Sequence, residues 1–320
     1  MKIAILSKMD AVIAALTRAL DAHAVTVCQS RAALLEAVAE AEVLVPQNPG
    51  FAFHTIDAEV LDRGRQLRLI QQFGVSWDVT DEVEAAKRKI PVATIAGESA
   101  VSVAEHGFHL LMCVSKRANE QPSSIRQGKI GQYASIQLAG KTVCIVGLGK
   151  IGKVLARFAR AFAMRVVAVK NRLDGTAEDY GVDVLLGAAA LNQGLALADF
   201  TVLVLPLNTA TFNLIGPEQF RIMKRGASLV NLSRGAHVDR DALVEALATG
   251  RLSSYAADAF WQEPADPNDP LFTHDRVIIT PHVGGVTDAA IEGAALAVRD
   301  NIQRLQEGQP LLRVINMKVA

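Results

Sequence analysis

The stretch Val143-Cys144-Ile145-Val146-Gly147-Leu148-Gly149-Lys150-Ile151-Gly152 decides the fold of this chain. Four apolar residues run into three glycines with the spacing G-x-G-x-x-G, and apolar residues then recur every three or four positions as far as Phe162. Strand, tight turn and amphipathic helix follow one another in the order that a dinucleotide-binding βαβ unit requires. Gly147 is expected to make the turn, Gly149 to admit a pyrophosphate, and Gly152 to let helix and strand pack closely.

The first helical turn, at Lys150 and Ile151, would direct backbone N–H groups at such an anion. The alternative is a glycine-rich turn in an α/β protein that binds nothing there. The buried-type strand before the glycines and the helix after them favour dinucleotide binding.

Composition narrows the class of protein. The chain has 320 residues, enough for two domains, and is 50% hydrophobic and 21% charged. Lys+Arg and Asp+Glu both number 33, so no net charge predicts a nucleic-acid or anionic membrane partner. The N-terminal residues lack the unbroken apolar core of a signal peptide, and no apolar run reaches membrane-spanning length. A cytoplasmic protein is predicted.

The three cysteines, Cys28, Cys113 and Cys144, are far apart and form no C-x-x-C motif. Reduced thiols are expected, with no disulfide and no metal site. His106 and His109 lie three residues apart on one predicted helix, but no further ligands stand near them in sequence. They are predicted to be core or interface histidines rather than metal ligands.

Two runs of alternating strands and helices predict two parallel sheets with helices on their faces. In the first run, helices are expected around residues 10–20, 31–41 and 81–88, and the strands are Ile3–Leu6, Val25–Val27, Val43–Val45, Leu67–Gln71 and Pro91–Ala93. The strands of the second run are Thr142–Val146, Arg165–Val169, Phe200–Leu205, Ser228–Asn231, Ser254–Asp258 and Arg276–Ile279. Helices at Ala100–Ser115 and Asp288–Gln306 would link the two units, and Lys116–Gln137 is expected to be irregular.

Three functional groups follow three successive strands of the second unit: Arg234, Glu263 and His282. Ligands of doubly wound sheets lie beyond these carboxyl ends. Reduction of a 2-oxo acid needs a proton donor, and histidine is well suited to that role near neutral pH. A positioned proton donor typically raises the rate by about 10²–10⁴. A carboxylate would hold the imidazole tautomer, and a guanidinium would clamp the substrate carboxylate.

Each of these residues also has a plainer interpretation. Arg234 would then form a loop salt bridge, Glu263 would be a solvated turn residue, and His282 a core histidine. Their joint placement at neighbouring strand ends favours the catalytic interpretation.

The sequence resembles the D-isomer-specific 2-hydroxyacid dehydrogenases over most of its length. The segments that carry the resemblance are Val146–Gly152, Leu205–Thr211, Val230–Gly235, Asp258–Pro264 and Thr280–Gly285, with Gln72–Asp78 and Val103–His106 in the front half. The resemblance implies that Arg234 binds and polarises the substrate, that His282 is the acid/base, and that Glu263 is its partner. It also implies that Asp258 holds the nicotinamide carboxamide.

The resemblance further implies a Rossmann nucleotide domain inserted in a flavodoxin-like substrate domain, both doubly wound parallel sheets of an α/β protein. The substrate domain would comprise residues 1–99 and 287–320, and the nucleotide domain residues 100–286. A homodimer through the nucleotide domains is expected. The substrate would contact Gly74, Val75 and Ser76 besides Arg234 and His282. Further cofactor contacts are expected at Leu205, Pro206, Thr211, Leu232, Ser233 and Gly284.

The second strand of the nucleotide unit departs from the NAD pattern. Where NAD enzymes place an acidic residue for the ribose 2′-OH, this strand ends in Lys170-Asn171-Arg172. Lys170 cannot accept a hydrogen bond and would attract a 2′-phosphate, with Arg172 as a second cation. NADP(H) is therefore the predicted cofactor, and NAD(H) remains the alternative if both cations are solvated.

The sequence thus predicts a reductase that transfers hydride between NADP(H) and a small 2-oxo acid, in the manner of glyoxylate and hydroxypyruvate reductases. One rival is a nucleotide-sensing binding protein, since the C-terminal-binding-protein corepressors resemble this family in fold and retain much of the catalytic set. Another is a formate or phosphite dehydrogenase. Formate enzymes of this fold generally carry glutamine where Glu263 stands, which argues against that assignment.

Overall fold

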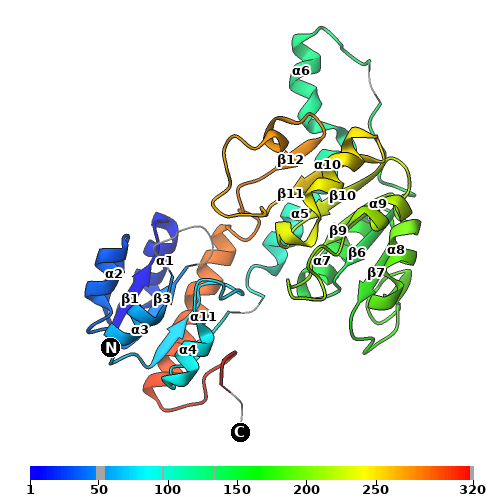
Figure 1. Cartoon of the computed structure of the whole chain (residues 1–320). Coiled ribbons are helices and arrows are strands. Elements are labelled where there is room, and N and C mark those ends of the chain that lie inside the picture. Colours follow the sequence, from blue (N-terminus) through cyan, green and yellow to red (C-terminus); the bar gives the residue numbers. More distant parts are fainter. Residues whose placement is uncertain (48–54, 96, 133, 318–320) are drawn as a thin grey trace. The chain divides into compact units, whose positions relative to one another are not determined.

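The computed structural model describes residues 1–47, 55–95, 97–132 and 134–317. The chain divides into two compact units, one made of Met1–Ser99 with Val286–Ala320 and the other of Ala100–Gly285 (Figure 1). No helix in these described ranges is both long and apolar enough to cross a bilayer.

The first unit is a five-stranded parallel sheet in the order β2-β1-β3-β4-β5. Its strands are β1 (Lys2–Leu6), β2 (Ala24–Cys28), β3 (Val43–Pro46), β4 (Leu69–Gln71) and β5 (Val92–Ala93). Its helices are α1 (Asp10–Ala19), α2 (Arg31–Ala37), α3 (Ala58–Arg63), α4 (Glu82–Lys87) and α11 (Asp288–Gln306). Helices cover both faces and bury two apolar clusters, which is the flavodoxin-like strand order predicted from the sequence.

The second unit is a seven-stranded parallel sheet in the order β12-β11-β10-β9-β6-β7-β8. Its strands are β6 (Thr142–Val146), β7 (Arg165–Lys170), β8 (Val184–Gly187), β9 (Phe200–Leu203), β10 (Ala227–Asn231), β11 (Leu252–Ala257) and β12 (Val277–Ile279). Its helices are α5 (Ala100–Lys116), α6 (Gln121–Arg126), α7 (Lys150–Ala161), α8 (Leu191–Leu197), α9 (Pro217–Ile222) and α10 (Arg240–Ala248). Short 3₁₀ turns stand at η2 (Ala118–Glu120), η3 (Ala188–Ala190), η4 (Gly235–His237) and η5 (Pro270–Thr273).

This order is the Rossmann arrangement with one strand added at the edge, and it confirms the predicted fold. The order of successive strands reverses between β6 and β9, which are parallel neighbours, and this places the ligand crevice beyond the carboxyl ends of those strands. One apolar cluster lies under α8, α9 and α10, and the other under α5 and α7.

Several elements were not predicted individually, among them α8, α9 and α10. The edge strand β8 is only partly buried and ends in glycine, so its apolar run is short and ambiguous. Helix α3 has six residues. The segment Lys116–Gln137, expected to be irregular, contains η2 and the short helix α6, so that expectation was wrong in part.

Candidate active site

The glycines between β6 and α7 stand where backbone segments meet closely. Gly147 has φ 108°, and a Cβ there would lie 2.1 Å from the carbonyl oxygen of Val204. A Cβ on Gly152 would lie 2.1 Å from the carbonyl oxygen of Gly147. Only glycine fits either position, which explains two of the three glycines by steric exclusion.

Gly149 differs from its two neighbours, because a Cβ there would meet nothing within 4 Å. It is the N-cap residue of α7, and because it is glycine it offers no side chain to cap the first N–H groups of the helix. The open space therefore lies at the amino end of a twelve-residue helix, where backbone N–H groups and the helix dipole favour an anion. These residues fit a dinucleotide pyrophosphate.

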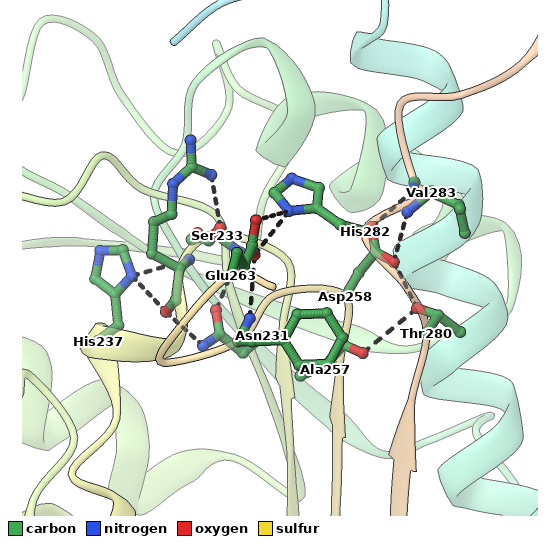
Figure 2. A network of polar contacts seen from close by, with 12 residues as sticks. Asn231, Ser233, His237, Ala257, Asp258, Glu263, Thr280, His282 and Val283 are labelled. Atoms are coloured by element: carbon green, nitrogen blue, oxygen red, sulfur yellow. Dashed lines mark hydrogen bonds and ion pairs between the residues drawn. The ribbon is translucent and has the colours of Figure 1, made fainter. Parts of the chain in front are cut away.

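His282 and Glu263 form a close pair beyond β12 and β11 (Figure 2). Nδ1 of His282 lies 2.9 Å from Oε1 and 3.0 Å from Oε2 of Glu263. Burial alone would raise the pKa of Glu263, but the hydrogen bond and charge of His282, the Phe260 amide and the charge of Arg234 outweigh burial and lower the pKa. Glu263 is thus a carboxylate that accepts a hydrogen bond from the proton on Nδ1 of His282, so that Nε2 is the ring nitrogen outside this pair.

The backbone of His282 is in the left-handed region, at φ 56°. Its amide donates to the carbonyl of Thr280 at 2.9 Å. Histidine adopts this conformation more readily than most residues, but it persists only where neighbouring contacts enforce it.

Arg234 lies in a loop whose backbone forms hydrogen bonds with buried polar side chains. Asn231 Nδ2 donates to the Arg234 carbonyl at 2.8 Å, and the Arg234 amide donates to Nδ1 of His237 at 3.2 Å. The guanidinium Nη1 donates to the carbonyl of Ser233 at 2.9 Å. Both Asn231 and His237 are fully buried, so the loop that carries the arginine is well defined.

Asp258 is buried at the end of β11 and accepts several hydrogen bonds from the protein (Figure 2). Its donors are the Thr280 hydroxyl at 2.6 Å, the Val283 amide at 2.9 Å and the Gly284 amide at 2.6 Å. Burial would raise the pKa of Asp258, but His106, Thr280 and these amides lower it. The carboxylate therefore secures the loop around His282, a role that the sequence did not indicate.

Lys170, the last residue of β7, has an acidic partner that the sequence analysis did not identify. Its Nζ lies 2.7 Å from Oδ1 of Asp174, and Arg172 approaches the same carboxylate at 3.7 Å. The Tyr180 hydroxyl also donates to Asp174. The hydrogen bond to Asp174 raises the pKa of Lys170 and, reciprocally, lowers the pKa of Asp174.

The remaining predicted contact residues lie at the same strand ends or in the first unit. The Leu205 amide donates to Ser233 Oγ at 2.9 Å, and Thr211 Oγ1 donates to the Pro206 carbonyl at 2.8 Å. Leu232 packs so closely that a Cβ on Gly107 would collide with it. Gly74, Val75 and Ser76 follow β4 in the first unit, where Val75 is 53% exposed.

Two residues that the sequence analysis left out of the site, His106 and Thr280, belong to the Asp258 network. His106 Nε2 lies 2.8 Å from Thr280 Oγ1 and 3.4 Å from Asp258 Oδ1. The position of Thr280 directly before Pro281-His282 was a usable signal, whereas the partner of His106 depends on the packing of α5. Among the described residues, no group of three His, Cys, Asp or Glu side chains is placed to hold a metal ion.

Residues 108–284 match the family model of the D-isomer specific 2-hydroxyacid dehydrogenase, NAD binding domain. This segment contains the glycine turn and the ends of β7, β10, β11 and β12 described above.

Individual proteins are similar over nearly the whole chain. A glyoxylate reductase from Korarchaeum cryptofilum is 33% identical over 297 residues, which cover 91% of this chain and 87% of the relative. A D-3-phosphoglycerate dehydrogenase from Methanocaldococcus jannaschii is 33% identical over 287 residues, but the match spans only 53% of that longer protein. The crystal structure of the TT0316 protein from Thermus thermophilus superimposes with a TM-score of 0.84 at 31% identity, covering 98% of this chain and 100% of that one.

Proposed function

The chain belongs to the D-isomer-specific 2-hydroxyacid dehydrogenase family, and we propose that within it the chain is an NADP(H)-dependent reductase of a small 2-oxo acid. Family membership makes it an oxidoreductase that transfers hydride between a nicotinamide dinucleotide and 2-oxo or 2-hydroxy acids. The catalytic residues, the cofactor preference and the substrate are our proposal. The observation that carries the catalytic assignment is the His282–Glu263 pair, at 2.9 Å between Nδ1 and Oε1.

His282 is assigned as the acid/base. In reduction, Nε2 would donate a proton to the substrate oxygen; the hydride for the carbon is the chemistry that a nicotinamide would supply when bound. Glu263 stabilises the imidazolium before transfer and keeps the remaining proton on Nδ1 afterwards. In oxidation, the neutral Nε2 accepts the hydroxyl proton.

Arg234 is assigned to the substrate carboxylate and the adjacent carbonyl. Its permanent charge and forked donors suit a 2-oxo acid, and it polarises the carbonyl as negative charge develops on oxygen. The well-defined loop at Asn231 and His237 supports this assignment, since a clamp is effective only when its backbone is fixed.

We assign substrate binding also to the first unit. Gly74, Val75 and Ser76 stand in the loop after β4, on the carboxyl side of a parallel sheet, where backbone amides commonly receive anions. Val75 is 53% exposed in this unit, which supports a surface role for the loop.

NADP(H) is proposed over NAD(H) because the end of β7 offers two cations, Lys170 and Arg172, and one carboxylate, Asp174. The carboxylate offsets part of the positive charge, so the preference is expected to be moderate. Binding constants for NADPH and NADH measure it directly, and equal affinity would contradict the preference.

A homodimer through the second unit is also proposed. Helix α6 stands apart from the sheet of this unit and buries none of its residues (Figure 1). Ile125 in this helix and Ile130 in the segment that follows it are 72% and 83% exposed. Large apolar side chains so exposed favour burial against a partner. Light scattering of the wild type and of Ile125→Lys tests this, with a shift towards monomer expected in the variant.

The function is tested by NADPH oxidation with glyoxylate, hydroxypyruvate, pyruvate, phenylpyruvate and branched 2-oxo acids. Glyoxylate comes first because the glyoxylate reductases from Korarchaeum cryptofilum and Thermococcus litoralis match this chain over 87% and 88% of their own length. Turnover of at least one acid is expected. Tight NADPH binding without turnover of any acid would favour a nucleotide-sensing protein instead.

The three cysteines are free, which supports a cytoplasmic location.

A further inference from the structure

Three polar side chains from distant parts of the second unit form one chain of hydrogen bonds. His106 Nε2, on α5, lies 2.8 Å from Thr280 Oγ1. Thr280 Oγ1 lies 2.6 Å from Asp258 Oδ1. The three residues come from the middle of a helix, the end of β12 and the end of β11, and all are at least partly buried.

The direction of each hydrogen bond follows from the number of protons. The Asp258 carboxylate only accepts, so the single hydroxyl proton of Thr280 points to Oδ1. Thr280 then has no proton left for His106, and the imidazole must donate from Nε2. His106 is therefore fixed with a proton on Nε2.

The other contacts of Asp258 fix the residues that follow His282. The amides of Val283 and Gly284 donate to the carboxylate at 2.9 and 2.6 Å (Figure 2). Thr280 precedes His282 by two residues and receives its amide on the carbonyl oxygen. Asp258 thus holds the loop on both sides of a histidine whose φ is 56°.

Helix α5 also lies close to the loop that carries His282. A Cβ on Gly284 would lie 2.8 Å from Asp258 Oδ2 and 3.3 Å from His106 Cδ2. The loop therefore touches both the carboxylate and the helix, and the position of the His106 ring limits where the loop lies.

We propose that His106, acting through Thr280 and Asp258, is a positioning residue that holds the His282 loop in its left-handed turn and so aims the imidazole. This inference rests on the proposed acid/base role of His282. It gives α5 a part in the reaction although no residue of that helix is assigned to the chemistry.

Matched variants of Thr280 test the proposal. Thr280→Val removes the hydroxyl at nearly constant volume and leaves His106 Nε2 only its longer 3.4 Å approach to Asp258 Oδ1. A displaced acid/base lowers kcat more than KM, by about tenfold to a hundredfold for a shift of order 1 Å. Thr280→Ser keeps the hydroxyl and should restore most of kcat. The affinity for NADPH, measured by fluorescence, should be similar in both variants.

Nitrogen chemical shifts of the His106 ring in the unmutated protein give a readout that needs no turnover. A ring with a proton on Nε2 is expected, and Thr280→Val should change its shifts while Thr280→Ser should not. An unprotonated Nε2 would overturn the proposal, even if the valine variant fails to fold.

Two kinetic outcomes would also overturn it: a normal kcat in Thr280→Val, or equal losses in the valine and serine variants. The first would show that the hydroxyl does not matter, and the second that only the shape of threonine does. His282→Ala separates this inference from the proposed function. If that variant keeps full turnover, the acid/base assignment is wrong; if it is inactive while Thr280→Val is normal, only the positioning role fails.

Discussion

Hydrogen bonds at the ends of β11 and β12 join residues that are far apart in sequence, whereas those at the end of β7 join near neighbours. His282 and Glu263 are 19 residues apart, and His106 and Thr280 are 174 apart. At β7, Lys170, Arg172, Asp174 and Tyr180 lie within a span of eleven residues.

The two regions also differ in exposure. Asp258 is 7% exposed and His282 25%, whereas Asp174 is 43% and Arg172 88% exposed. Buried ion pairs are screened little by salt, and removing one partner of such a pair is strongly destabilising. Exposed ion pairs contribute little to stability. Substitutions at the ends of β11 and β12 should therefore reduce activity strongly. Substitutions at the end of β7 should change cofactor affinity by smaller amounts.

The largest effect is expected for His282→Ala. Without the proton donor, kcat should fall by about 10²–10⁴ while NADPH affinity changes little. Stopped-flow reduction and fluorescence titration measure the two quantities. His274→Ala is a matched control, since its Nδ1 accepts from the Arg276 amide and is bonded to none of the proposed acid/base groups. Near-normal turnover in His282→Ala would place the acid/base elsewhere.

Arg234→Lys should have the next largest effect. Lysine keeps the charge but loses the forked donors, so KM should rise and kcat should fall, together by about a hundredfold in kcat/KM. Steady-state kinetics measure both constants. Arg240→Lys, in which the replaced arginine pairs with Asp269 away from the strand-end groups, should stay close to the wild type. Comparable losses in the two variants would point to a general requirement for arginine.

Glu263→Gln should reduce kcat by about tenfold to a hundredfold, because glutamine does not stabilise the imidazolium. Folding lowers the pKa of Glu263, so its carboxylate adds stability above its ordinary value of about 4.3, and this is lost as pH falls through the lowered value. Denaturation of both proteins from pH 7 to pH 3 should therefore show a difference in stability that shrinks in acid. A difference that grows in acid would mean that the pKa shift has the opposite sign.

The sequence predicted the two sheets and the strand-end positions of Arg234, Glu263 and His282, because parallel strands bring their carboxyl ends to one edge. It could not predict the partner of His106, which depends on how α5 packs against a loop 174 residues away. Nor did it reveal that Asp174 reaches back to Lys170, because that contact depends on the conformation of an exposed loop. Hydrophobic periodicity predicts the helices and strands. It predicts contacts between residues only where the topology of the sheet makes them neighbours.

Lys170→Ala should weaken NADPH binding by about tenfold while NADH binding changes little, since a charged hydrogen bond to the 2′-phosphate is lost. Titration with 2′,5′-ADP and 5′-AMP isolates the same contact without the nicotinamide. Lys224→Ala is the control, because Lys224 forms a similar ion pair with Asp199 elsewhere in the unit. Equal loss for both nucleotides would show that Lys170 contacts something other than the 2′-phosphate.

The smallest change is expected for Asp174→Asn. Asp174 shares Lys170 with any incoming phosphate, so neutralising it should tighten 2′,5′-ADP binding several-fold and leave 5′-AMP unaffected. The gain should shrink in high salt, because the pair is exposed. Asp179→Asn is matched to it, since Asp179 stands on the same loop and bonds Thr176 instead of Lys170. If Asp174→Asn instead weakens 5′-AMP and NADH, the carboxylate is itself the acceptor of the ribose 2′-OH, and this strand end then selects NAD(H) through a residue four positions after the one that usually does so.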